Sequence, residues 1–295
     1  MLSSSILAPL SLILAATVWG LVWYPYRLLE EAGISGSLAS MLTYLVGLML
    51  LLPLVDRHHL FARSERGLLL ALAFTAGWTN LAYVLAVIHG EVMRVLLLFY
   101  LAPLWTVLFA RLLLAERAGR MAYAVIGLSL AGAYVMLSKS GGLPLPTNAA
   151  EWLGLSAGVG FALTNVLTRK ISSAPIALRS LAVFGGVVLL SGLYALHEGS
   201  SLRTVFALDV QDWWMVVGIA LALLLAIFSV QYGLAHTPAN QAIVILLSEL
   251  VVAAIASRYL AGEMMDPQEW IGGAMIVAAT LFSGQLEQKS EKPHV

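Results

Sequence analysis

The sequence contains no cysteine, few charged residues and no excess of either sign of charge. The absence of cysteine excludes disulfide bridges, thiolate metal sites and cysteine nucleophiles. Basic and acidic residues are equal in number, so the chain lacks the basic surface that nucleic acids bind. Charged residues make up only 11% of the chain, against about 25% in soluble domains. A fully water-exposed surface cannot be built from this composition.

Catalytic and nucleotide-binding signatures are also missing. The chain has no Walker sequence, no HExxH and no G-x-S-x-G. Transport driven by ATP on this chain and hydrolysis by a recognisable nucleophile and base are therefore disfavoured. We expect a protein that is not an enzyme and that uses no cofactor or metal. An intramembrane enzyme that acts on a lipid stays open as an alternative.

Long apolar segments account for most of the chain. Hydrophobic residues make up 60% of it and the mean hydropathy is +0.90. Ten segments are each near the ~20 residues that cross a bilayer core. They span residues 8–28, 36–55, 67–88, 92–114, 121–138, 150–169, 177–197, 212–234, 238–260 and 267–286. Because lipid offers the backbone no hydrogen bonds, each segment is predicted to be a helix. The predicted fold class is an all-α integral membrane protein.

An internal repeat relates the two halves of the chain. The stretch from His89 to Glu116 recurs from His236 to Glu263, at a shift of 147 positions (263 − 116 = 147). The copies end in RLLLAE and RYLAGE, and we expect each terminal glutamate to pair locally, Glu263 for example with Arg258. A duplicated membrane unit is typical of secondary transporters, whose substrate site lies between the repeats.

The distribution of lysine and arginine predicts the orientation. With ten spans, one side of the membrane carries 11 basic residues and the other carries 5. The richer side should be cytoplasmic, which places both termini there. Since five spans is an odd number, the second repeat must enter from the opposite face. The predicted domains are two inverted five-helix repeats at 1–140 and 148–288, followed by a cytoplasmic tail at 289–295.

Several motifs resemble one transporter family over nearly the whole chain. The first span reads AATVWGLVWYPYR (15–27), and RVLLLFYLAPLWTVLFARLLLAER (94–117) contains a proline and ends in an Ala-Glu-Arg turn. The second half repeats this with ILLSELVVAAIASRYLAGE (245–263) and WIGGAMIVAATLFSG (270–284). Their order and duplication resemble drug/metabolite transporters of the EamA type. The resemblance implies an inner-membrane carrier and favours export.

The chain departs from this family at two places. The family's second copy often has Glu-Pro where this chain has Glu249-Leu250, so a softer helix break is expected there. The first span also lacks the buried carboxylate of the small multidrug-resistance relatives. An antiporter for cationic drugs is therefore disfavoured.

Glu249 is the sharpest functional candidate. It lies inside the ninth apolar segment, between IVILLS and LVVAAIA. A carboxylate at the bilayer centre costs about 2.5–3.5 kcal/mol on insertion scales, so ionisable groups there are usually functional. We expect Glu249 to bind a proton or a substrate ammonium group. The alternative is a structural carboxylate that is hydrogen-bonded to neighbouring helices.

Two residues of the fourth segment are further candidates. Arg94 could hold a substrate carboxylate or phosphate at the helix start; alternatively, it reaches the headgroups or pairs with Glu91 one turn away. Pro103 removes one backbone hydrogen bond and should bend the helix, either as a moving gate or as a static kink.

Aromatic and amide side chains predict a central cavity. The cavity candidates are Trp19, Trp78, Asn80, Tyr83, Tyr100, Asn165 and Gln231. Amides in hydrocarbon need polar partners, and a polar cavity would supply them. Packing of the aromatic residues and hydrogen bonds between helices alone are the alternatives.

The predicted function is alternating-access transport of a small organic metabolite, an amino acid or a relative. The expected partners are this substrate, the lipid bilayer and a coupling proton, with the chain as a monomer or homodimer. An uncoupled channel or facilitator for small solutes is the alternative.

Overall fold

The computed structural model describes residues 4–54, 66–115, 120–137, 145–171, 174–200, 205–206, 208–236 and 245–291, and these residues are almost entirely helical. The elements are α1 (Ser4–Leu21), α2 (Trp23–Glu31), α3 (Gly36–Leu51), η1 (Leu52–Leu54), α4 (Arg66–His89), α5 (Val92–Phe99), α6 (Ala102–Leu113), α7 (Arg120–Leu137), α8 (Ala149–Lys170), α9 (Ile176–His197), α11 (Val210–His236), α13 (Ser248–Leu260) and α14 (Pro267–Glu291).

These helices form the ten predicted membrane crossings, and in two cases consecutive helices share one crossing. Helices α1 and α2 form the first crossing with a joint at Val22, and α5 and α6 form the fourth. Most observed ends lie within a few residues of the predicted ones, for example 66–89 against 67–88. The last helix continues to Glu291, so the first residues of the predicted tail are helical.

Several helices begin at a residue whose side chain caps the helix start. The Ser35 hydroxyl accepts a hydrogen bond from the Leu38 amide at the start of α3. Asn148 does the same for the Glu151 amide at the start of α8, and Glu151 bonds back to the Thr147 amide. Gly33 between α2 and α3 has φ +88°, a conformation that favours glycine.

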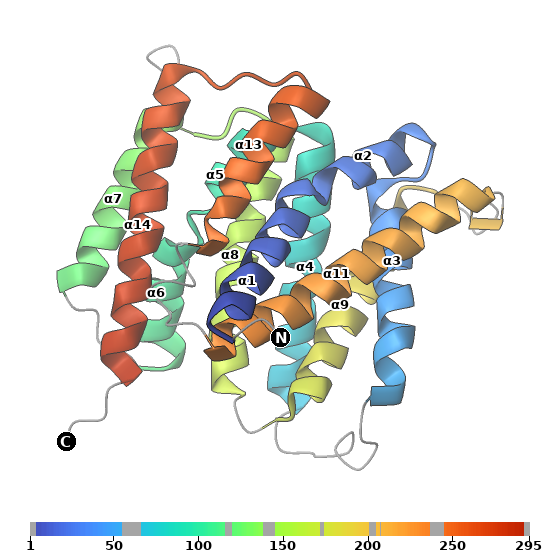
Figure 1. Cartoon of the computed structure of the whole chain (residues 1–295), viewed down its shortest axis with the longest axis horizontal. Coiled ribbons are helices and arrows are strands. Elements are labelled where there is room, and N and C mark those ends of the chain that lie inside the picture. Colours follow the sequence, from blue (N-terminus) through green and yellow to red (C-terminus); the bar gives the residue numbers. More distant parts are fainter. Residues whose placement is uncertain are drawn as a thin grey trace.

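The packing of the helices has the two-fold pattern of an inverted repeat. In the first repeat α1 packs on α11 and α13 of the second, and in the second repeat α8 packs on α4, α5 and α6 of the first. Two pairs are self-equivalent: α3 packs on α9, and α7 on α14. Figure 1 shows α7 and α14 side by side at one edge of the molecule and α3 toward the other. The fold is therefore two inverted five-helix repeats.

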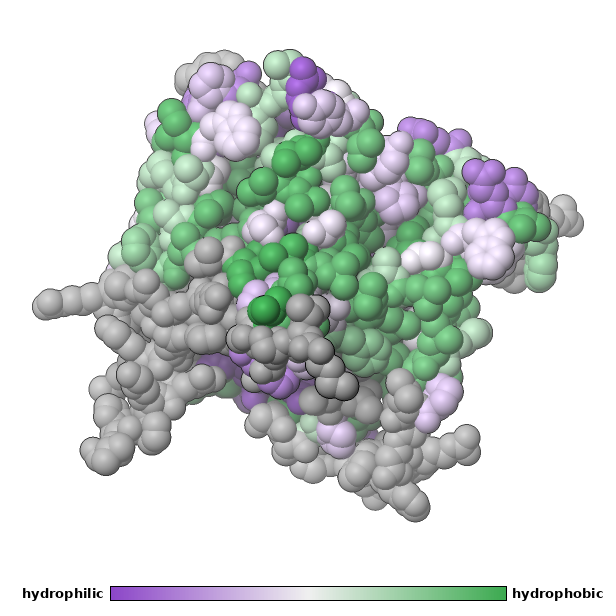
Figure 2. Space-filling view, viewed as in Figure 1, coloured by the Kyte–Doolittle hydropathy of each residue, from purple (hydrophilic) through white to green (hydrophobic). Residues whose placement is uncertain are grey.

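The outer surface suits a hydrocarbon environment. Among the described residues, five helices are both long and apolar enough to cross a membrane, and Gly36–Leu51 and Tyr123–Val135 are shorter apolar helices. Large apolar side chains such as Leu70 and Leu189 point outward. In Figure 2 hydrophobic side chains cover the middle of this face, while hydrophilic ones gather along its upper edge. Lipid, rather than water, is the solvent that this surface requires.

Candidate functional site at the junction of two broken helices

Both repeats contain a broken helix at equivalent positions. Helix α5 ends at Phe99 and α6 begins at Ala102; in the second repeat Leu247 is a turn residue and α13 begins at Ser248. The shift of 147 aligns Tyr100 with Leu247 (247 − 100 = 147). Leu247 interrupts the described helix there without a proline, and its backbone keeps right-handed helical angles, φ −63° and ψ −13°. The expectation of a softer break beside Leu250 stays a prediction.

Pro103 belongs to the first turn of α6 and does not kink a continuous helix. At this position the missing N–H costs nothing, because the first N–H groups of a helix have no partner within it. The predicted mid-helix kink is therefore a break between two helices. Whether the break moves stays a prediction.

Tyr100 and Glu249 join the two breaks across the repeats. The Tyr100 hydroxyl donates a 2.9 Å hydrogen bond to Oε2 of Glu249, which lies in the first turn of α13. No basic side chain forms an ion pair with Glu249 within the described part of the chain. The N-terminal end of α13 carries the positive pole of the helix dipole, which stabilises a negative charge there. Glu249 thus has one neutral partner and a favourable field.

Aromatic rings from both repeats lie close to this contact. Tyr83 and Phe99 meet edge to face with centroids 5.5 Å apart, and Phe99 also contacts Tyr100 and Phe161. The two phenylalanines were not predicted, although both lie within apolar runs next to predicted residues. The resulting chemistry is one carboxylate beside several aromatic faces.

Helix α1 reaches the same junction through a glycine. A Cβ atom on Gly20 would lie 2.8 Å from the backbone oxygen of Glu249, so only glycine allows this approach. Trp19 precedes it and packs, half-buried, against the core cluster around Tyr26 and Leu29. The Trp-Gly pair of the first span therefore has a structural reason at this position.

Arg94 forms ion pairs that were not predicted from the sequence. Its side chain is buried and contacts two buried carboxylates: Nη1 lies 3.1 Å from Oε1 of Glu269, and Nε lies 3.0 Å from Oε1 of Glu151. The second contact is an ion pair without an aligned hydrogen bond. Glu91 is exposed at the start of α5. Arg94 thus connects α5 to the first turns of α8 and α14.

The Asn80 side chain forms hydrogen bonds that connect α4 to α3. Its amide oxygen accepts a hydrogen bond from Ser40, and its amide nitrogen donates 2.9 Å to the Tyr44 hydroxyl. Hydrogen bonds between helices therefore account for Asn80 without a cavity.

Two of the remaining cavity candidates, Trp78 and Asn165, do not join the Tyr100 cluster. Trp78 is exposed over 39% of its surface, and Asn165 on α8 is also exposed. Gln231 belongs to α11, but its side chain lies outside the described residues. Of the predicted residues, the structure brings together Glu249, Tyr100 and Tyr83.

One contact between the ends of the repeats could not be predicted from the sequence. Glu263 pairs with Arg27 at 3.1 Å, so the expectation of a local pair with Arg258 was wrong. The partner is 236 residues away in the sequence, and no local pattern indicates it. The partners of Arg94 did leave a signal, because Asn148-x-x-Glu151 and Asp266-x-x-Glu269 are capping boxes. Glu116 lies outside the described residues.

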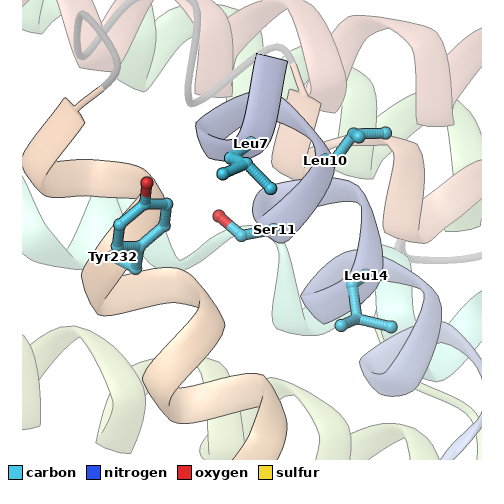
Figure 3. A pocket seen from close by; sticks show the side chains of 5 residues that line it. All are labelled: Leu7, Leu10, Ser11, Leu14 and Tyr232. Carbon is cyan, nitrogen blue, oxygen red and sulfur yellow. The ribbon is translucent and has the colours of Figure 1, made fainter. Parts of the chain in front are cut away.

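A shallow groove opens between α1 and α11. It has a volume of about 550 Å³ and is lined by Leu7, Leu10, Ser11, Leu14 and Tyr232. Figure 3 shows the first four on α1, with Tyr232 facing them from α11. None of the predicted site residues lines it. No group of three or more His, Cys, Asp or Glu side chains that could hold a metal ion occurs in the described part of the chain.

Comparisons with known proteins agree with the duplicated membrane fold. The model of the EamA-like transporter family matches the chain twice, at residues 6–138 and 148–285. An "Uncharacterized transporter" of Archaeoglobus fulgidus is 28% identical over 240 residues, covering 80% of this chain and 82% of that protein. The "Uncharacterized transporter YwfM" of Bacillus subtilis is 25% identical over 166 residues, or 56% of this chain and 54% of that protein.

A solved structure, titled "Crystal structure of protein", shares the fold with a TM-score of 0.57 at 17% identity. The alignment covers 96% of this chain and 99% of that one. Two inverted repeats that meet at broken helices define a membrane transporter. The chain belongs to the EamA-like transporter family, whose model covers both repeats.

Proposed function

We propose that this protein is a secondary transporter that moves a small organic metabolite by alternating access, with its substrate site at the Tyr100–Glu249 contact. The single observation that carries the proposal is that the helix breaks of both repeats meet at this hydrogen bond. Rocking one repeat against the other would change this contact. Transporters of inverted-repeat design bind substrate and coupling ions at such discontinuous helices.

The chemistry of the site favours an amino acid or a related amine. The Glu249 carboxylate can accept an ammonium group, and the rings of Tyr83, Phe99 and Phe161 offer faces that attract cations and apolar bodies. The N-terminal end of α6 carries the positive pole of its helix dipole, which favours a substrate carboxylate there, although Pro103 has no N–H and the Leu104 N–H donates to the Leu101 carbonyl. A zwitterion would satisfy both ends of this arrangement.

Glu249 also supplies a means of coupling. A half-buried carboxylate whose one partner among the described residues is neutral can hold either a proton or a substrate ammonium, and the two would compete for it. We place the protein in the inner membrane with both termini in the cytoplasm, from the 11 to 5 distribution of basic residues. Export is the direction that the family resemblance favours. A monomer or a homodimer is consistent with this function.

Counterflow in proteoliposomes tests the proposal. Vesicles preloaded with an unlabelled amino acid should show an overshoot of the same labelled amino acid, with aromatic and aliphatic members compared. Glu249→Gln should abolish the overshoot, because an amide cannot exchange a proton or pair with ammonium. The control is Glu91→Gln, which removes an exposed carboxylate and should leave transport unchanged.

Two results would contradict the proposal. Glu249→Gln with unchanged uptake across pH would remove Glu249 from the site. Downhill flux without any stimulation by substrate on the opposite side would favour an uncoupled facilitator.

A further inference from the structure

Arg27 and Glu263 form a second contact between the repeats. It lies at the ends of α5 and α13 that are opposite to the Tyr100–Glu249 contact. The Arg27 guanidinium donates from Nη2 to Glu263 at 3.1 Å and to the Gly90 carbonyl at 2.6 Å, and from Nε to the Val87 carbonyl at 2.8 Å. It also lies 4.9 Å from the centre of the buried Trp23 ring. Arg27 thus ties the end of the first crossing to the turn between α4 and α5 and to the segment after α13.

Glu263 completes this contact by capping another helix. Its Oε2 accepts a 2.8 Å hydrogen bond from the Val92 amide at the start of α5. Burial raises the pKa of Glu263, and the Arg27 charge lowers it in part. The positive end of α5 also favours a carboxylate at this place. One carboxylate from the second repeat therefore holds two elements of the first.

Two helices connect this contact to the proposed substrate site. Helix α5 has 8 residues, with Val92 at one end and Tyr100 directly after the other. Helix α13 has 13 residues, with Glu249 in its first turn and Glu263 three residues beyond its end. At 1.5 Å per residue they are about 12 Å and 20 Å long. The two helices pack on each other and are joined at both ends.

The Arg27–Glu263 pair differs from a permanent structural pair in its surroundings. Its side chains are 18% and 16% exposed, and a single carboxylate bridges the repeats. The Arg94 contacts are 11%, 4% and 2% exposed and involve two carboxylates. A partly hydrated pair loses less when it separates, since water replaces the broken contacts. Such a pair can open and close during a cycle.

We propose that Arg27 and Glu263 form a latch that holds this end of the transport pathway closed and that opens when α13 moves at Glu249. The inference rests on the proposed alternating-access function. When Glu249 exchanges its partner, the start of α13 shifts against α5, and the rigid helix carries this shift to Glu263. The latch then releases the turn between α4 and α5, and the pathway opens toward the face where α2 and α13 end.

Thiol labelling tests the latch without any substrate. Because the chain has no cysteine, Ser248→Cys gives a single reporter beside Glu249 with little change in side-chain size. A membrane-impermeant methanethiosulfonate is applied to intact cells and to inverted vesicles, which expose opposite faces. In the reporter background, Glu263→Gln should raise the labelling rate from the latch face about 10-fold, as expected for loss of a hydrogen bond between charged groups. Labelling from the other face should fall.

Matched variants separate a latch from a general loosening of the structure. Glu31→Gln removes an exposed carboxylate at the end of the same helix as Arg27 and should leave both rates unchanged. Arg27→Gln should open the same face at least as much as Glu263→Gln, because it also loses the bonds to the Gly90 and Val87 carbonyls. The double variant should show less than the sum of the two single effects, since both single variants lose the Arg27–Glu263 pair.

Unchanged labelling in both single variants would overturn the proposal, and so would effects that simply add. Labelling that rises equally from both faces would also overturn it, since that result indicates unfolding. The assay requires no transport, so its failure is distinguishable from a wrong substrate class. A working latch in a protein without counterflow would leave the latch intact and refute the proposed substrate.

Discussion

Arg94 and Glu249 are both ionisable groups within apolar segments, yet they differ in the partners that surround them. Arg94 is buried between two carboxylates, each held by the capping interactions of a helix start. Within the described part of the chain, Glu249 has one polar partner, the neutral Tyr100 hydroxyl. A charge whose partners are complete stabilises the fold. A charge whose partners are incomplete is free to bind something else.

The comparison assigns the two residues to different properties of the protein. Arg94 joins three helices on one face and should govern stability. Glu249 lies where the helix breaks of the two repeats meet and, under the proposed function, should govern transport. Each variant below is expected to change one property and spare the other.

The largest expected effect is on stability, from Arg94→Met. The substitution leaves two buried carboxylates without their cation, which costs about 3–5 kcal/mol of unfolding free energy in comparable buried pairs. A marked drop in Tm of the purified protein would be seen by thermal unfolding in detergent. Adding Glu151→Gln and Glu269→Gln should recover much of the loss. A normal Tm with lost transport would instead place Arg94 in the substrate path.

An intermediate effect on transport is expected from Tyr100→Phe. The variant removes only the hydroxyl that donates to Glu249, and hydrogen bonds to charged groups contribute about 1.5–3 kcal/mol. The kcat/KM of counterflow should fall by about 10- to 150-fold, with Tm unchanged. Tyr24→Phe, at the Trp23 ring contact, is the matched control and should transport normally. Equal kinetics in both variants would separate Tyr100 from the site.

The smallest effect is expected from Asn80→Ala. Its amide joins α3 to α4 through Ser40 and Tyr44, and interhelical hydrogen bonds in membranes contribute about 0.6 kcal/mol on average. Tm should fall slightly while counterflow persists. If transport were lost at a normal Tm, Asn80 would touch the substrate after all, and the polar-cavity prediction would hold.

Much of the fold follows from the sequence because the bilayer fixes helix length and hydrophobicity. The third apolar segment was predicted at 67–88 and α4 runs from Arg66 to His89. The duplication and the odd number of spans in each half then required an inverted repeat. The joint at Val22 was not predictable, because this residue does not differ in propensity from its apolar neighbours. The break at Leu247 was expected only from the family resemblance, since its local sequence is equally apolar.

The candidate site was predictable only in part. Glu249 stands out as a charge in an apolar run, and Tyr100 as a polar aromatic residue beside a proline. Their contact depends on two helices from different repeats, which no local pattern specifies. The same limit applies to Arg27 and Glu263, whose pairing across the repeats is a property of the assembled fold.

The helices of the two repeats are arranged in equivalent ways, but the side chains at equivalent positions differ. The shift that aligns the repeats places Ala102 opposite Glu249, so only one of the two equivalent half-helices begins with an acid (249 − 102 = 147). A carrier with identical halves would rest equally on either side of the membrane. Here a single carboxylate makes the two halves chemically unequal. Under the proposed alternating access, this one-sided acid would give the empty carrier an energetic preference for one side of the membrane.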